Sequence, residues 1–344
     1  MRIFACPGCS RVVYYDNLSC LACGTELAYD RENVALVAVV GERYRAAGGV
    51  RRRCMNTIAG CNWLTADDEA SECFSCLLTR SRPVEGEQNI FDWLAETSHA
   101  KRWLIFQLDE LGLPIVSHRD KPNGGLAFDL DATTDDHRVM IGHMNGVITI
   151  DLSEAQDSHR EALRVLLGEA YRTMLGHFRH EIGHYYWMTL VASDPARLEA
   201  FRERFGDERQ DYGQALTAHY SGGVAAWQHD HISQYATTHP WEDFAETFAH
   251  YLHICGTLQS AGAFGLSMAG PGEDLGARGS LTSHPTLTPQ SAASVRDILA
   301  EWQPLALALN LVNRSLGKGD LYPFTIADPV VEKLEYVHRL VSGR

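Results

Sequence analysis

Two histidines and a glutamate in one short segment have the types and spacing of a hydrolytic metal site. Residues 180–184 read His-Glu-Ile-Gly-His, and the apolar, aromatic-rich stretch 171–191 around them predicts a helix. Four residues exceed one helical turn slightly, so His180 and His184 share a face and can hold one zinc ion. Glu181 lies near that ion without needing to bind it, so it is free to take a proton from an activated water.

A catalytic zinc site needs a third protein ligand and an open coordination position. The candidate segment is 241–246, Trp-Glu-Asp-Phe-Ala-Glu, in a helix predicted to begin at Pro240. Glu242 and Glu246 are four residues apart and share a helical face. One carboxylate can therefore bind zinc while the other accepts the free N–H of a ligand histidine. The alternative is that both face solvent, and the apolar residues around them argue against it.

Eight of the nine cysteines precede residue 80 and form two groups of four. The first group consists of two Cys-x-x-Cys pairs, which predict a closed site of four thiolates around zinc; its members are Cys6, Cys9, Cys20 and Cys23. The second group has a wider first half and predicts a second structural zinc; its members are Cys54, Cys61, Cys73 and Cys76. An arrangement that shares cysteines between the groups stays open at this point. We expect one catalytic and two structural Zn2+ ions.

The composition is that of a globular protein, and the net charge is −14. Binding to nucleic acid or to an anionic membrane needs a positive surface, so this charge makes nucleic acid an unlikely partner and argues against a membrane. The sequence has no stretch near the roughly 20 apolar residues of a membrane span, which favours a cytoplasmic location. Thiols stay reduced in that compartment, so the cysteines favour metal binding over disulfides.

The chain divides at a segment rich in proline, glycine and charge, residues 82–87. We predict a tandem cysteine zinc-ribbon region over residues 1–83 and a second, mainly helical domain over 84–344 that contains a small sheet. Strand patterns flank an Asn-Gly turn at 145–146, and residues 256–279 have the Gly, Ala and Ser content of a flexible excursion. The predicted fold class is therefore α+β.

The pattern of His180-Glu181-x-x-His184 followed by Glu242-x-x-x-Glu246 resembles the gluzincin metallopeptidases. That resemblance implies a zincin-like domain in which Glu242 is the third zinc ligand and Glu246 supports a ligand histidine. The Glu-x-Phe-Ala-Glu sequence is most similar to the lethal-factor-like branch. That branch has a tyrosine seven residues before the ligand glutamate, where Tyr235 stands here, and the implied role of Tyr235 is to donate a hydrogen bond to the oxyanion.

The whole chain, with cysteine ribbons followed by His-Phe-Arg-His-Glu-Ile-Gly-His-Tyr-Tyr-Trp, is similar to bacterial proteins described as zinc-binding metallopeptidases. The spacer between His184 and Glu242 is longer than in thermolysin-like enzymes, so the walls of the cleft differ. These features predict a zinc metallopeptidase that hydrolyses peptide or isopeptide bonds of an intracellular protein or peptide, with ribbons that recruit the substrate or a protein partner. Two alternatives are a non-catalytic zinc-binding adaptor and a protease recruited to nucleic acid.

Overall fold

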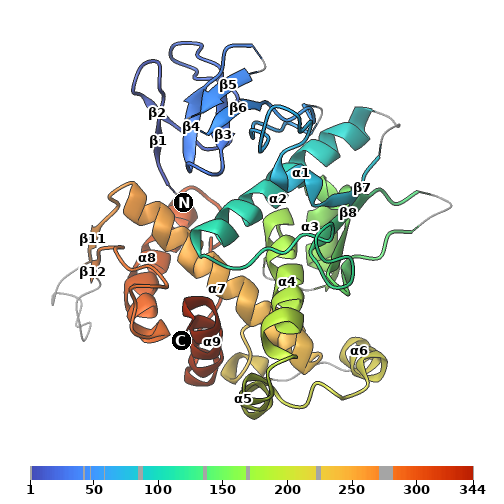
Figure 1. The fold of residues 1–344 in the computed structure, drawn as a ribbon. Coiled ribbons are helices and arrows are strands. Elements are labelled where there is room, and N and C mark those ends of the chain that lie inside the picture. Colours follow the sequence, from blue (N-terminus) through green and yellow to red (C-terminus); the bar gives the residue numbers. More distant parts are fainter. Residues whose placement is uncertain are drawn as a thin grey trace. The chain divides into compact units, whose positions relative to one another are not determined.

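The computed structural model describes residues 2–343 except 42, 47, 58, 84–87, 135–137, 168–170, 222–225 and 271–281. Two compact units make up the chain. The N-terminal unit comprises residues 2–106 and 115–160, and the C-terminal unit comprises residues 107–114 and 161–344. The first contains most of the strands and the second is mostly helical (Figure 1), so the predicted α+β class is confirmed.

The N-terminal unit begins with three short antiparallel strand pairs, formed by β1 (Phe4–Ala5) with β2 (Val12–Val13), β3 (Leu27–Asp30) with β4 (Ala35–Ala38) and β5 (Arg43–Ala46) with β6 (Gly49–Arg52). A short helix, α1 (Phe74–Leu77), follows them. Their core is aromatic, because the ring of Tyr29 packs on those of Tyr15, Trp63 and Phe106 at centroid distances of 5.7, 5.1 and 5.5 Å. Segments this short form a stable core only with extra support, which the cysteine groups can supply.

A four-stranded sheet completes this unit, in the order β7 (Thr79–Ser81), β8 (Ala127–Asp131), β10 (Val147–Asp151) and β9 (Gly142–Met144). The pairs β7–β8 and β8–β10 are parallel, whereas β9 and β10 form an antiparallel hairpin. Asn145 and Gly146 both have positive φ, 47° and 90°, as a tight hairpin turn requires. The predicted turn is therefore confirmed. The helix α2 (Gln88–Glu110) lies between β7 and β8 in the sequence.

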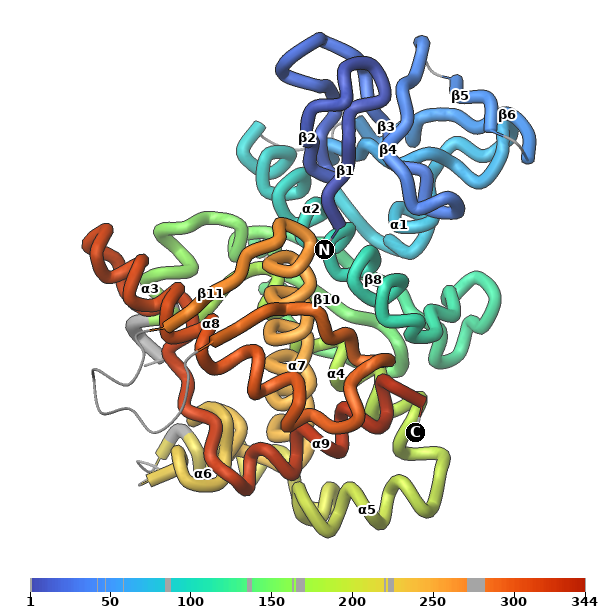
Figure 2. The backbone as a smooth tube through the Cα atoms, turned by 90° about the vertical axis from the view of Figure 1, so that its left-hand side faces the viewer, coloured from blue at the N-terminus to red at the C-terminus, as the bar shows by residue number. Residues whose placement is uncertain are grey.

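The C-terminal unit contains the helices α3 (Asp157–Leu167), α4 (Met174–Tyr186), α5 (Pro195–Phe205), α6 (Tyr212–Ser221), α7 (Pro240–Ala263), α8 (Val295–Ser315) and α9 (Asp328–Ser342), with α3 beginning at the unit boundary. A two-stranded ladder, β11 (Met268–Ala269) with β12 (Thr282–Ser283), joins them. The long helix α7 packs against α4, α8 and α9 (Figure 2). Its apolar face is buried, and Phe248 stacks on Tyr186 of α4 with ring centroids 5.4 Å apart.

Gly183 allows α4 and α7 to approach closely. A Cβ atom at this position would lie 2.9 Å from the Cα of Ala245, closer than real side-chain atoms pack. Gly183 therefore faces α7 directly, and Ile182 beside it is fully buried. This contact places the histidines of α4 opposite the glutamates of α7.

The prediction of a flexible excursion over 256–279 is wrong in its first part. Helix α7 continues to Ala263, because Leu258 and Ala261 pack into the core. Gly256 does not interrupt the helix, since its missing side chain makes room for Gln107, whose amide nitrogen would lie 2.8 Å from a Cβ there. Residues 271–279 of the segment lie outside the described residues. Within the described chain, no helix combines the length and apolarity needed to cross a membrane.

Candidate active site and metal centres

The helix α4 presents His180, Glu181 and His184. Its N-terminus is capped by Thr173, whose hydroxyl accepts the backbone N–H of Gly176 at 3.0 Å. The two histidine rings lie on one face of the helix with their Nε2 atoms 3.2 Å apart. The predicted spacing of one helical turn therefore brings both imidazoles to one point.

The helix α7 brings Glu242 to the same point. Pro240 occupies its first turn, as predicted, and the His239 side chain caps it by accepting the Trp241 N–H at 3.1 Å. The Oε2 atom of the buried Glu242 lies 2.9 Å from Nε2 of His180 and 3.4 Å from Nε2 of His184. All three donor atoms lie within 4.8 Å of one another. Two imidazole nitrogens and one carboxylate oxygen fit a zinc ion with an open position.

Glu246 lies behind His180, one turn further along α7. Its Oε1 atom is 2.7 Å from Nδ1 of His180, and its Oε2 atom accepts the Ser233 hydroxyl at 2.5 Å. A proton on Nδ1 leaves Nε2 free to bind a metal. Burial lowers the pKa of His180, but hydrogen bonds to Glu242 and Glu246 outweigh it, so the net shift is well above the ordinary value. Protons therefore compete with a metal at this site.

Glu181 is buried beside the two histidines, with 6% of its surface exposed. Its Oε2 atom accepts no hydrogen bond from any residue that the structure describes. A buried carboxylate oxygen without a donor is costly, so it marks a position where a water or a substrate group belongs. This is a second observation in favour of a ligand at the His180–His184–Glu242 site.

Two tyrosines adjoin this site. Tyr235 lies in a short 3-10 turn, Tyr235–Thr237, and its ring centroid is 5.8 Å from that of His180. Tyr212, the first residue of α6, donates a hydrogen bond of 2.9 Å to Oε1 of Glu242. Burial raises the pKa of the Tyr212 phenol and the Glu242 carboxylate raises it further, so the phenol stays protonated and remains a donor. Tyr212 could not be predicted from the sequence, because no motif connects it to a glutamate in a different helix.

Asp243 points away from the three donor atoms and forms a buried ion pair. Its Oδ2 atom lies 2.6 Å from Nζ of Lys333 in α9, and the same ammonium donates to the backbone oxygen of Asp230 at 2.6 Å. Burial raises the pKa of Asp243 to about 6, and the Lys333 charge opposes that shift. Lys333 therefore connects α9 both to the helix that carries Glu242 and to the segment that leads to Tyr235.

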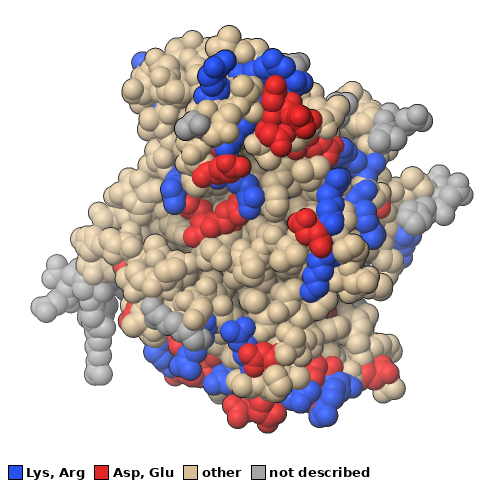
Figure 3. Space-filling model, in the orientation of Figure 1, with Lys and Arg blue, Asp and Glu red and all other residues tan. Residues whose placement is uncertain are grey.

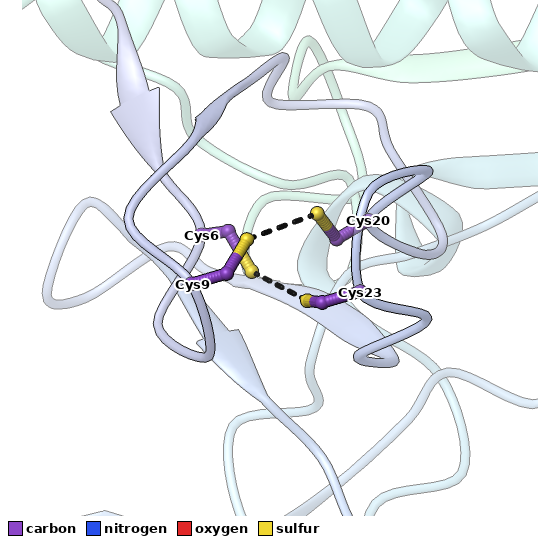
Figure 4. A group of neighbouring side chains, drawn as sticks. All are labelled: Cys6, Cys9, Cys20 and Cys23. Carbon is purple, nitrogen blue, oxygen red and sulfur yellow. Dashed lines mark hydrogen bonds between the residues drawn. The ribbon is translucent and has the colours of Figure 1, made fainter.

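The first cysteine group forms one cluster, with sulfur atoms facing each other across two chain turns (Figure 4). The Sγ atoms of Cys6 and Cys23 are 3.6 Å apart, and those of Cys9 and Cys20 are 3.7 Å apart. Cys9 and Cys23 are exposed, whereas Cys6 and Cys20 are buried. Four converging thiols without a disulfide fit a structural zinc.

The second cysteine group forms a separate cluster that is buried throughout, consisting of Cys54, Cys61, Cys73 and Cys76. The Sγ atoms of Cys61 and Cys73 are 3.6 Å apart, and those of Cys61 and Cys76 are 3.9 Å apart. The two clusters therefore do not share cysteines, which resolves the alternative that the sequence left open. Cys255 is buried in α7 and lies outside both clusters.

Two cations of α2 flank the second cluster. The Lys101 ammonium donates to the Ser75 backbone oxygen at 2.8 Å and to the Thr79 hydroxyl, and it is buried. The Arg102 guanidinium donates to the backbone oxygens of Ala59 and Gly60, each at 3.0 Å. Burial lowers the pKa of Lys101, while the nearby Cys76 and Cys73 oppose that shift. Both residues escaped the sequence analysis, since a helix pattern does not reveal which loop its cations approach.

Comparisons with known proteins agree with this arrangement. A profile for the family described as "Putative zinc-binding metallo-peptidase" matches residues 90–340, and a zinc-ribbon domain profile matches residues 3–86. Similar relatives include the proteins described as "Uncharacterized protein Rv2568c" from Mycobacterium tuberculosis and "Uncharacterized protein Mb2598c" from Mycobacterium bovis. Each is 43% identical over 345 residues, which cover 99% of this chain and 96% of the relative. No solved structure matches the chain.

The family that the motifs predict and the N-terminal zinc ribbon are both confirmed by these matches. The ribbon match contains both cysteine clusters, and the longer match contains the convergent histidines and glutamate. Zinc is the metal that the family description and the two clusters have in common. The chain therefore belongs to this zinc-binding metallo-peptidase family.

Proposed function

We propose that the chain is a gluzincin-type metallopeptidase in which His180, His184 and Glu242 hold one catalytic zinc. The observation that carries this proposal is the convergence of two Nε2 atoms and one carboxylate oxygen within 4.8 Å. The hydrogen bond from His180 to Glu246 supports it, because it orients the imidazole for metal binding. The cysteine clusters hold the two structural zinc ions in this proposal.

Each residue of the site has a chemical task in peptide hydrolysis. Zinc, when bound, supplies Lewis acidity toward a water and toward the scissile carbonyl. Glu181 has a buried carboxylate oxygen without a donor, so it takes the proton of the attacking water and then delivers it to the leaving amine. Tyr235 lies beside His180 and donates a hydrogen bond to the oxyanion of the tetrahedral intermediate.

The substrate in this proposal is a peptide or isopeptide bond of a protein, and the ribbons recruit that protein or a partner. Recruitment to nucleic acid finds no support in the basic run 51–53. Arg51 pairs with Asp30 and Glu32, and Arg52 pairs with Asp68. Positive and negative side chains are intermixed on the visible face over β5 and β6 (Figure 3). Charge that is already compensated attracts phosphate weakly.

The test is a comparison of the wild type with Glu181→Gln on a peptide library digested from a cellular proteome. We expect the wild type to generate new termini, and the variant to lose activity by about 10²- to 10⁴-fold. Zinc content should be the same in both proteins, because Glu181 handles protons and does not bind the metal. The matched control is Glu199→Gln, at an exposed position of α5, which should keep full activity.

Two results would contradict the proposal. Equal cleavage by a zinc-replete Glu181→Gln protein would remove Glu181 from the reaction. Absence of cleavage by the zinc-replete wild type, on both the library and intact proteome proteins, would favour the alternative of a non-catalytic zinc-binding adaptor.

A further inference from the structure

Tyr212 is held in place by a small framework that joins the beginnings of α6 and α7. Asp211 caps α6 by accepting the backbone N–H of Gln214 at 2.8 Å. In the loop just before it, the Gln210 backbone oxygen lies 3.2 Å from Nε2 of His239, which caps α7 through its other nitrogen. The Tyr212 ring packs edge-on against the same His239, with centroids 5.4 Å apart.

This framework sets the position of the Tyr212 hydroxyl relative to Glu242. The hydroxyl donates to Oε1 of Glu242 at 2.9 Å, while Oε2 faces the Nε2 atoms of His180 and His184. The two oxygens of one buried carboxylate therefore have different partners. The outer oxygen is occupied by a phenol, and only the inner oxygen points between the imidazoles.

A zinc ligand with two free oxygens can bind through one of them or through both. Binding through both would occupy the position that a catalytic zinc site leaves open for water and substrate. A hydrogen bond to one oxygen opposes this, because the phenol would lose its acceptor if that oxygen turned to the metal. Removal of a group that hydrogen-bonds to a metal ligand commonly lowers metal affinity ~10–100-fold.

We propose that Tyr212 is a positioning residue that restricts Glu242 to binding zinc through a single oxygen and thereby keeps the fourth position open. The proposal deepens the proposed function and rests on its assignment of Glu242 as a ligand. Tyr212 acts through Glu242, whereas Tyr235 lies against His180. In this proposal Tyr212 acts on the ligand, and Tyr235 acts on the substrate.

The experiment uses the full chain and compares the wild type with Tyr212→Phe, which keeps the ring that packs on His239 and removes only the hydroxyl. The control is Tyr14→Phe, at a tyrosine of the N-terminal unit that is 60% exposed. One measurement is zinc affinity at the His180–His184–Glu242 site, by competition with a chromophoric chelator. The other is the visible spectrum after loading with Co2+, corrected with a His184→Ala protein treated identically so that thiolate absorption is removed.

We expect Tyr212→Phe to lower zinc affinity by ~10–100-fold. The Co2+ ligand-field bands should also become weaker, because a second carboxylate oxygen raises the coordination number of the metal. The melting temperature and circular dichroism should match those of the wild type, and Tyr14→Phe should change none of these quantities. A Co2+ spectrum identical to that of the wild type would overturn the proposal.

Failure of the proposed function has a different signature. If Glu242→Ala keeps both the zinc affinity and the Co2+ spectrum of the wild type, Glu242 is not a ligand, and both proposals fall. If Glu242→Ala loses the metal while Tyr212→Phe keeps affinity and spectrum, only the assignment of Tyr212 falls. If peptide hydrolysis is absent but Tyr212→Phe alters the spectrum, the positioning role stands and the peptidase activity does not.

Discussion

The buried cysteine cluster and the His180–His184–Glu242 site have different charged side chains in contact with or next to their donor residues. Lys101 and Arg102 lie beside the cluster, and both are buried. The histidines are instead accompanied by Glu246 and Glu181, which are acidic.

The difference follows from the charge of each donor set. Four thiolates around Zn2+ carry a net charge of about −2, so a buried cluster of this kind needs cations nearby. Two neutral imidazoles and one carboxylate around Zn2+ leave a net charge of about +1, which tolerates further carboxylates. The buried cysteine cluster, a closed site, thus has cations that only compensate its charge. The His180–His184–Glu242 site, here called the open site, has acids that can also hold or move a proton. We expect the surrounding charge to distinguish the proposed structural site from the proposed catalytic site.

Removal of all metal should give the largest effect, and one part of the chain should unfold while another stays folded. We expect the segments that carry the cysteine clusters to unfold in the presence of a strong chelator and reductant, because structural zinc contributes about 10–16 kcal/mol to such folds. The helices α4, α7 and α9 should stay folded, since their shared core is apolar. Hydrogen exchange measured by mass spectrometry on the full chain resolves the two outcomes by segment.

The control for this experiment is the same protein with zinc restored, which should recover the protection. Retained protection around Cys54–Cys76, after elemental analysis shows that zinc has been lost, would contradict the role of the cluster in folding. Unfolding of α4 and α7 together with the cysteine segments would erase the contrast between the two kinds of site.

Substitutions at the two glutamates should give the next largest effect. Glu242→Ala removes a ligand, so we expect zinc affinity at the open site to fall by several orders of magnitude. Glu246→Ala removes the acceptor of His180 Nδ1, and the expected loss is ~10–100-fold. Chelator competition measures both losses, with the exposed Glu199→Ala as the unaffected control.

The opposite result, in which Glu246→Ala empties the site and Glu242→Ala leaves it filled, would show that the ligand is Glu246, one turn further along α7. Asp243 cannot serve as a neutral control in this series. Removing it would leave Lys333 buried without its partner, at a cost of about 3–5 kcal/mol in stability.

Replacement of Lys101 by methionine should give the smallest effect and tests the charge argument directly. We expect zinc affinity at the buried cluster to fall roughly tenfold, because one buried charge interaction of 1–2 kcal/mol is lost. The partly exposed first cluster and the His180–His184–Glu242 site should keep their zinc affinities. Lys318→Met, the same change at an exposed position, is the control. Unchanged zinc retention in Lys101→Met would mean that the cation does not compensate the thiolates.

The sequence predicted those parts of the molecule that depend on local spacing. The histidines one turn apart, the start of α7 at Pro240 and the Asn145–Gly146 turn all follow from short-range rules, and the structure has them. The paired cysteines also follow from local geometry.

The contacts that spacing does not encode were missed. Tyr212 meets Glu242 only because a loop brings α6 to α7, and Lys333 meets Asp243 from a helix near the C-terminus. The excursion predicted over 256–279 began too early, because the role of Gly256, to make room for Gln107, depends on a residue far away in the chain. Local propensity predicts elements, whereas these residues are explained only by tertiary packing.

The two hydrogen bonds of Lys333, to Asp243 and to the backbone of Asp230, have a consequence for folding during translation. Residues 180–246 leave the ribosome well before α9, which begins at Asp328. Until Lys333 emerges, Asp243 is a carboxylate without its cation, and the segment leading to Tyr235 lacks one of its anchors. The nascent chain therefore contains every proposed zinc ligand before the hydrogen bonds of Lys333 can form. We therefore expect the framework around Asp243 and Asp230 to form only after α9 has been synthesised and has docked.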